Sequence, residues 1–78
     1  MVYFDLRQHA KALADFERAV NLAPGQAESH YSIGQVRIQM GQVSEAIQEY
    51  DKALKIKPGY TAALKAKHVA VQFLDHRE

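Results

Sequence analysis

The chain has 78 residues, no cysteine, and 10 Lys and Arg residues against 9 Asp and Glu residues. This length holds one domain at most, and the lack of cysteine excludes a disulfide framework, a thiolate zinc site and a thiol nucleophile. The near-neutral charge disfavours a nucleic-acid partner, and no apolar run approaches the roughly 20 residues that cross a bilayer, so no membrane partner is predicted. The first residues also lack the basic start and long apolar stretch of a signal peptide, which leaves the cytoplasm as the default location.

The N-terminal part of the chain predicts a short segment followed by an amphipathic helix. Residues 1–7 are shorter than two helical turns, and we interpret them as the end of a helix whose beginning is missing, so that the chain is a piece of a longer array. Over residues 9–22 the apolar residues recur with the i, i+3, i+4, i+7 spacing of a helix with one buried face. Pro24 and Gly25 then predict the end of this helix. Its apolar stripe consists of Ala12, Leu13, Phe16, Ala19 and Val20.

Three further helices are predicted beyond this turn, over residues 27–40, 43–56 and 61–75. Gly41 follows the first of them and suits a helix C-terminus. Gly34 lies in the middle of the same helix, where glycine costs about 1 kcal/mol relative to alanine. We therefore expect a neighbouring helix to approach closely at Gly34.

Two halves of the chain repeat each other at one fixed offset. Pro24 recurs 34 residues later as Pro58, and Ala19 recurs as Ala53 at the same distance. Between such identities, the substitutions keep aromatic, aliphatic or charged character. A period of this length indicates a solenoid, in which each unit buries its apolar face by stacking on a neighbour.

Residues 27–60 contain one complete unit, in which small, aromatic and turn-forming residues occupy set positions. These residues are Ile33, Gly34, Gly41, Ala46, Tyr50, Ala53 and Pro58. In this register the unit resembles a tetratricopeptide repeat, a helix-turn-helix of 34 residues. Two positions depart from the family pattern, because His30 stands where tryptophan is common and Arg37 where tyrosine is common. We expect looser or wetter packing beside these two residues.

The resemblance implies an all-α fold of antiparallel helical hairpins, stacked as a short right-handed α-solenoid. The whole chain would form one domain of this kind. Residues 1–26 would be a partial repeat, mostly its second helix, and residues 27–60 a full repeat. Residues 61–78 would supply a terminal first helix or a capping helix.

No residue pattern in the chain predicts catalysis, a metal site or a bound cofactor. No two histidines are three or four positions apart, and neither cysteine nor a carboxylate cluster accompanies them. No serine has a base partner in any local pattern, so no catalytic residue is predicted and the chain is not expected to be an enzyme. Structural or surface roles are predicted for His9, His30, His68 and His76.

The resemblance further implies that the first helix of each hairpin lines a concave groove. The mixture of apolar and polar side chains at these positions suits a peptide or protein segment, whose identity the sequence does not give. The alternative is that these are ordinary half-exposed residues of a scaffold. The predicted groove residues are Glu28, Tyr31, Gln35, Ile38, Gln39, Lys65, Val69, Gln72 and Phe73.

A second hypothesis is a structural segment that self-associates. In this hypothesis the helices over residues 9–22 and 61–75 both expose apolar surface, because each lacks most of its hairpin partner. The last helix of one chain would then pack on the first helix of another and produce a homo-oligomer.

Overall fold

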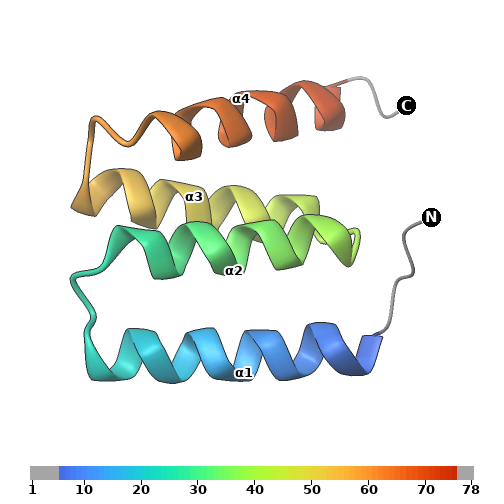
Figure 1. The fold of residues 1–78 in the computed structure, drawn as a ribbon. Helices are drawn as coiled ribbons and strands as arrows, with labels where there is room; N and C mark the ends of the chain where they lie inside the picture. The colour runs from blue at the N-terminus through green and yellow to red at the C-terminus, as the bar shows by residue number, and fades with distance from the viewer. Residues whose placement is uncertain (1–5, 76–78) are drawn as a thin grey trace.

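The computed structural model describes residues 6–75, which form four helices joined by short turns. They are α1 (Leu6–Leu22), α2 (Ala27–Gln39), α3 (Val43–Ile56) and α4 (Thr61–Asp75). Each helix runs antiparallel to the one before it, and the packed pairs are α1 with α2, α2 with α3, and α3 with α4 (Figure 1). The predicted all-α fold is therefore confirmed. Within residues 6–75, no helix combines the length and hydropathy needed to cross a membrane.

The turn between α2 and α3 depends on Gly41. Its φ angle is +80°, a left-handed conformation that glycine adopts without the steric penalty of a Cβ atom. The Gly41 amide donates to the carbonyl of Ile38 at 3.0 Å, and the Gln42 amide donates to the carbonyl of Arg37 at 2.8 Å. This pair of bonds is the Schellman motif, which satisfies carbonyl groups at the end of a helix.

Helix α1 begins before residue 9, which is its predicted first residue. Leu6 and Arg7 lie in α1, whereas residues 1–7 are predicted above to end a preceding helix. The residue that aligns with the turn glycine Gly41 is Arg7, which does not favour a left-handed conformation, so the helix continues through it. The same prediction for residues 1–5 lies outside the described residues.

The α2–α3 pair approaches most closely where Gly34 faces Tyr50. A Cβ atom added to Gly34 would lie 2.5 Å from Cε1 and 2.8 Å from Cδ1 of the Tyr50 ring. The ring is 1% exposed, and the neighbouring Ala46 is fully buried. The absence of a side chain at Gly34 thus creates the space that the aromatic ring of α3 fills, as the sequence predicts for this glycine.

Three alanines from three helices meet at the next contact along the stack. Ala27 of α2, Ala53 of α3 and Ala63 of α4 form one buried cluster, against which Tyr31 and Tyr60 pack. Small side chains allow helices to pack at the low end of the usual separation of about 8–10 Å. This cluster holds α4 against the preceding hairpin.

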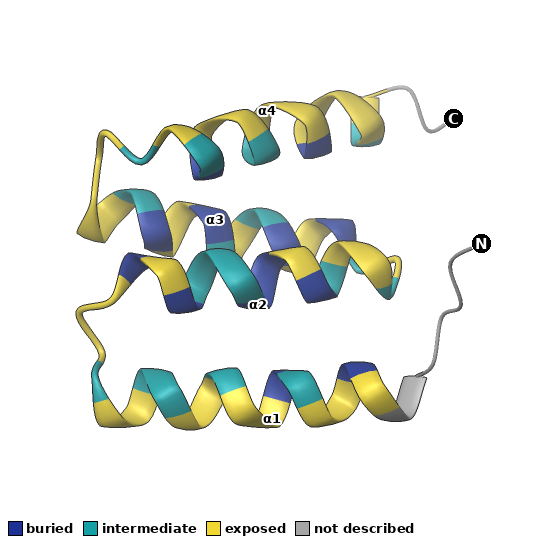
Figure 2. Cartoon of the chain, in the orientation of Figure 1, coloured by how far each residue is buried: buried dark blue, intermediate teal, exposed yellow. Residues whose placement is uncertain are grey.

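Helix α1 packs on the other side of α2 through a separate apolar cluster. Leu13 of α1 is buried against Ile33 and Val36 of α2, and Phe16 and Met40 pack at the edge of this contact. Helix α2 therefore buries residues toward both neighbours, whereas α1 buries one face (Figure 2).

The two outer helices differ in what they expose to solvent. In the described part of α1, Leu22 is the single large exposed hydrophobic residue, and the rest of the exposed face is mainly polar. On α4, by contrast, Leu64 is 48% exposed and Val71 is 36% exposed. The expectation that both outer helices present apolar surface therefore holds for α4 and not for α1, because the polar residues between the apolar positions of α1 face outward.

Candidate functional site: the groove between α2 and α4

An open groove of about 930 Å³ lies between α2 and α4, with α3 beneath it. Its α2 side is formed by Tyr31, Gln35 and Ile38, which follow one another at i, i+4 and i+7 along one helix face. Val43 and Tyr50 of α3 lie at its base. The α4 side is formed by Thr61, Ala62, Lys65, Ala66, Val69, Ala70 and Phe73.

Most of the predicted groove residues meet in this hollow. The six that line it are Tyr31, Gln35, Ile38, Lys65, Val69 and Phe73. These side chains line the groove because they lie on the faces that α2 and α4 turn toward it.

Three predicted residues are not among those lining the groove. Gln39 and Gln72 are exposed and each lies one position, about 100° around its helix, from a lining residue. Glu28 lies in the first turn of α2, where its Oε2 is 3.8 Å from the Nζ of Lys57 in the α3–α4 turn. These three residues therefore lie outside the lining of this hollow.

The base of the groove is not among the residues predicted from the sequence. Val43 and Tyr50 belong to the buried stripe of α3, and the sequence indicates only that such residues are covered by neighbours. Because α3 lies between α2 and α4, two residues of this stripe border the groove although they are largely buried. These two residues can be assigned to the groove only once the position of α3 relative to α2 and α4 is known.

Two tyrosine rings pack against Tyr31 on the α2 side of the groove. The Tyr31 ring lies 5.8 Å from the Tyr50 ring and 5.4 Å from the Tyr60 ring, centroid to centroid, and both pairs are tilted. The ammonium group of Lys57 lies 5.0 Å from the centroid of Tyr60. Desolvation, followed by the nearby Glu28 and Tyr31, raises the pKa of the Tyr60 hydroxyl. These ring contacts fix Tyr31 at the groove edge.

A hydrogen bond joins the base of the groove to its α2 side. The Tyr50 hydroxyl donates to Oε1 of Gln35. Burial, and secondarily the neighbouring Tyr31, raise the pKa of Tyr50 to about 12, so its hydroxyl keeps its proton at neutral pH and remains a donor. The Gln35 side chain makes no other hydrogen bond within the described residues, so its amide nitrogen has two protons without an acceptor.

Lys65 supplies the formal charge of the groove. It lies on α4, and no carboxylate within residues 6–75 forms an ion pair with it. No aspartate or glutamate lines the groove beside it. The groove thus combines apolar sides with one unpaired positive charge.

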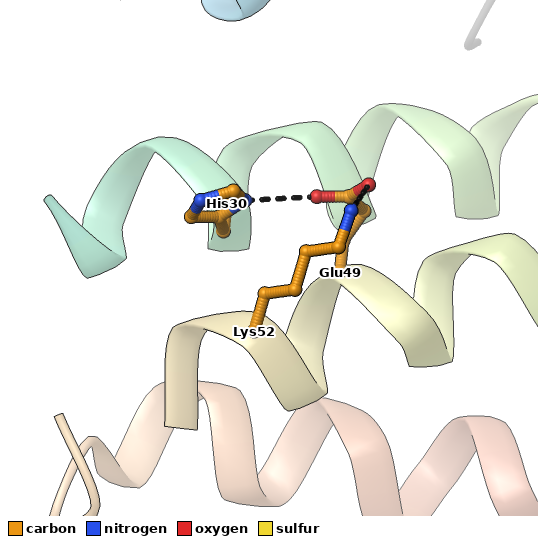
Figure 3. Close-up of polar contacts among 3 residues, drawn as sticks. All are labelled: His30, Glu49 and Lys52. Atoms are coloured by element: carbon orange, nitrogen blue, oxygen red, sulfur yellow. Dashed lines mark hydrogen bonds and ion pairs between the residues drawn. The ribbon is translucent and has the colours of Figure 1, made fainter. Parts of the chain in front are cut away.

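A second, smaller hollow of about 290 Å³ lies among α1, α2 and α3. There, Nδ1 of His30 is 3.0 Å from Oε1 of Glu49, and Lys52 reaches the other oxygen of the same carboxylate at 3.4 Å (Figure 3). The pair of His30 and Glu49 includes one of the two residues, His30, beside which the sequence predicts looser or wetter packing. Within the described part of the chain, no group of three or more potential ligand side chains is placed to hold a metal ion.

The polar groups that line the groove are hydroxyl groups, one amide and one ammonium group. Its hydroxyl groups belong to Thr61 and to tyrosines, and no histidine or carboxylate lines it beside them. The lining also offers apolar area and aromatic rings.

Comparison with known proteins places this chain among helical repeat sequences. A family profile described as Tetratricopeptide repeat matches residues 1–61. The chain is 27% identical over 70 residues to the mitochondrial import receptor subunit TOM70 of Homo sapiens, an alignment that covers 90% of the chain and 12% of the receptor subunit. It is 30% identical over 53 residues to tetratricopeptide repeat protein 17 of Danio rerio, which covers 68% of the chain and 4% of that protein. The chain therefore spans a small part of these relatives, and no solved structure matches it with comparable significance.

Proposed function

From the premise that this chain belongs to the tetratricopeptide repeat family, a family of protein-interaction scaffolds, we propose that it is a non-catalytic module that binds a peptide or protein segment in the groove between α2 and α4. The observation that supports this proposal is the groove itself, an unfilled hollow with apolar and aromatic sides. Val69 is 64% exposed and Phe73 is 56% exposed on its α4 side. Burial of such side chains by a partner would contribute favourable free energy to binding.

The orientation of the groove residues also supports this function. Tyr31 is held by two neighbouring rings, so little side-chain entropy is lost when a ligand packs against it. One of the similar proteins is named as an import receptor subunit, which is a protein with binding partners. The partner of the present chain is proposed only as a segment of protein.

The test begins with peptides selected on the wild-type chain from a random library. We expect Tyr31→Ala and Lys65→Glu each to weaken binding of the selected peptides by about tenfold or more, because both side chains line the groove. Affinity is measured by calorimetric titration, and helicity by circular dichroism on the same samples.

The matched control is Gln48→Ala, which changes an exposed residue of α3 that does not line the groove. This variant should bind the peptides as the wild type does. Wild-type affinity in both Tyr31→Ala and Lys65→Glu, with helicity preserved, would contradict the proposed site.

A second candidate function is self-association through the outer face of α4, supported by the exposed side chains of Leu64 and Val71. The polar exposed face of α1 makes contact between two copies of α4 a better candidate than contact between α4 and α1. Light scattering should then give a mass that rises with concentration, and Leu64→Glu should abolish the rise. A monomer mass at every concentration would rule out this candidate.

A further inference from the structure

The outer face of α4 is an apolar surface separate from the groove. Leu64 and Val71 are exposed on it, seven positions apart. They lie about 10.5 Å from each other along the helix and within about 20° around it. Neither residue lines the groove, whose α4 side includes Val69 and Phe73 at about 140–180° around the helix from this pair. A partner can therefore cover Leu64 and Val71 without entering the groove.

The repeat period shows which surface of α2 corresponds to the outer face of α4. Leu64 occupies the position of His30, and Val71 occupies the position of Arg37. In α2 both positions face the next helix, where His30 contacts Glu49 of α3 and Arg37 donates to the residue that precedes α3. The outer face of α4 is thus the face that α2 covers with a helix, and in α4 its side chains are apolar and exposed.

A helix that packed on this face as α3 packs on α2 would not fit. His68 occupies the position of Gly34, where the absence of a side chain makes room for the ring of Tyr50. Even a Cβ atom at Gly34 would lie 2.5 Å from Cε1 of that ring, and a histidine side chain is much larger. The helix that covers the outer face of α4 must therefore lie farther from α4 than α3 lies from α2.

We infer that the outer face of α4 binds the same face of a second copy of this chain, with the two α4 helices antiparallel, Leu64 of each copy against Val71 of the other, and both grooves left open. This inference rests on the second candidate function above and gives the geometry of that contact. A two-fold axis between positions 67 and 68 produces both Leu64–Val71 contacts at once, because every contact in such an interface occurs twice.

The charges at the two ends of α4 favour the antiparallel arrangement. Asp75 ends the helix and forms no ion pair within residues 6–75, and the first turn contains no acidic residue. A carboxylate is unfavourable at the C-terminal end of a helix dipole and favourable at the N-terminal end. Asp75 lies four positions beyond Val71, so antiparallel pairing brings it to the position four before Leu64, beside the start of the other α4 at Thr61. A parallel pair would instead bring the two Asp75 carboxylates together.

The contact is small, so the dimer should dissociate readily. Helix α4 has 15 residues and is about 22 Å long, which is too short to bury the roughly 800 Å² per partner of a standard interface. Lys67, which lies beside the two-fold axis, does not add an uncompensated charge, because its Nζ is 2.6 Å from Oδ1 of Asp51 in the same chain. We expect a dissociation constant on the order of 10–1000 μM.

Disulfide trapping tests the arrangement, since the chain has no cysteine of its own. Chains with Leu64→Cys and chains with Val71→Cys are mixed, oxidised mildly at high concentration and analysed by mass spectrometry. The linked heterodimer should exceed either linked homodimer by about fivefold or more. The reason is that two positions 64 of an antiparallel pair are about 10 Å apart along the helices, whereas a disulfide joins Cα atoms at most about 7 Å apart.

A charge reversal tests the contact at the helix ends. Asp75→Lys should raise the dissociation constant of the dimer about fivefold or more, measured by sedimentation equilibrium. Lysine suits the C-terminal end of its own helix, so weaker association of this variant would not reflect unfolding. Asp15→Lys makes the same change of charge at an exposed position of α1 and should leave the dissociation constant unchanged.

The possible failures are distinguishable. Linked homodimers in equal or greater amount than the heterodimer would overturn the antiparallel arrangement, as would wild-type association of Asp75→Lys. A monomer mass at every concentration up to about 1 mM would overturn both this inference and the second candidate function. The peptides selected on the wild-type chain should bind Leu64→Glu with unchanged affinity. Loss of that binding would show that the outer face of α4 takes part in peptide recognition, and would overturn the assignment of this face to a second copy.

Discussion

Tyr50→Ala should lower the free energy of unfolding by about 3–5 kcal/mol, the usual range for truncation of a large buried aromatic residue. The Tyr50 ring is 1% exposed and packs in one cluster with Val43, Ala46 and Ala70. Its removal leaves a cavity among three helices, because Gly34 has no side chain that could move into the space. The total stability of a domain of this size is on the order of 4–12 kcal/mol, so the variant loses a large share of it.

Urea unfolding followed by circular dichroism at low temperature measures this loss. Tyr50→Phe is the control, since it keeps the ring and removes only the hydrogen bond to Gln35, which should cost about 1 kcal/mol. The equivalent position of the preceding repeat is Phe16, so phenylalanine suits this kind of site. If Tyr50→Ala unfolds at nearly the same urea concentration as Tyr50→Phe, the ring is not the main packing element of the α2–α3–α4 contact.

Much of the fold follows from local features of the sequence. Helices α2, α3 and α4 begin and end within a residue of the predicted positions, because the turns before α2, between α2 and α3, and between α3 and α4 each carry a glycine or a proline with a defined conformational effect. Gly41 is the clearest case, since its positive φ angle ends α2. The start of α1 was harder to predict, because no residue at Arg7 interrupts the helix and the repeat period alone suggested a turn there.

The groove follows from the sequence only in part. Helical periodicity and the family resemblance indicate which faces of α2 and α4 border the groove, and these faces include Tyr31 and Lys65. They did not resolve the edges of that surface, since a rotation of about 100° separates Gln39 from Ile38. The hydrogen bond between Tyr50 and Gln35 depends on where α3 lies beneath α2, which no local pattern encodes.

Polar contacts between helices show the same limit. His30 and Glu49 lie 19 positions apart in the chain and meet because the α2–α3 hairpin brings them together. The sequence shows that His30 departs from the family pattern. It does not identify Glu49 as the partner of His30. The physical reason is that a side-chain pair across two helices depends on the relative rotation of the helices, whereas a helix boundary depends on its own residues.

Gly34→Ala should lower the stability of the chain by up to about 2 kcal/mol, although alanine is the better helix former by about 1 kcal/mol. The added Cβ would lie 2.5 Å from Cε1, 2.8 Å from Cδ1 and 3.1 Å from Cζ of Tyr50, and real Cβ contacts are essentially never shorter than 3.0 Å. Either the ring or the α2 backbone must shift, and the ring is enclosed by its neighbours. The melting temperature should fall by about 4–8 °C for each kcal/mol lost.

Gly59→Ala is the matched control for Gly34→Ala, since no atom lies within 4 Å of the position that its Cβ would take. This variant should keep or slightly raise the stability, because alanine has less backbone freedom in the unfolded chain. A double-mutant cycle then identifies the source of the loss at Gly34. In a Tyr50→Ala background, kept folded with a stabilising osmolyte, Gly34→Ala should become stabilising, because the ring that it meets is gone and only the gain in helix propensity remains. A loss of stability of the same size in both backgrounds would mean that the added methyl group meets the backbone of α3 and not the Tyr50 ring, so that the small residue is required by the approach of the two helices themselves.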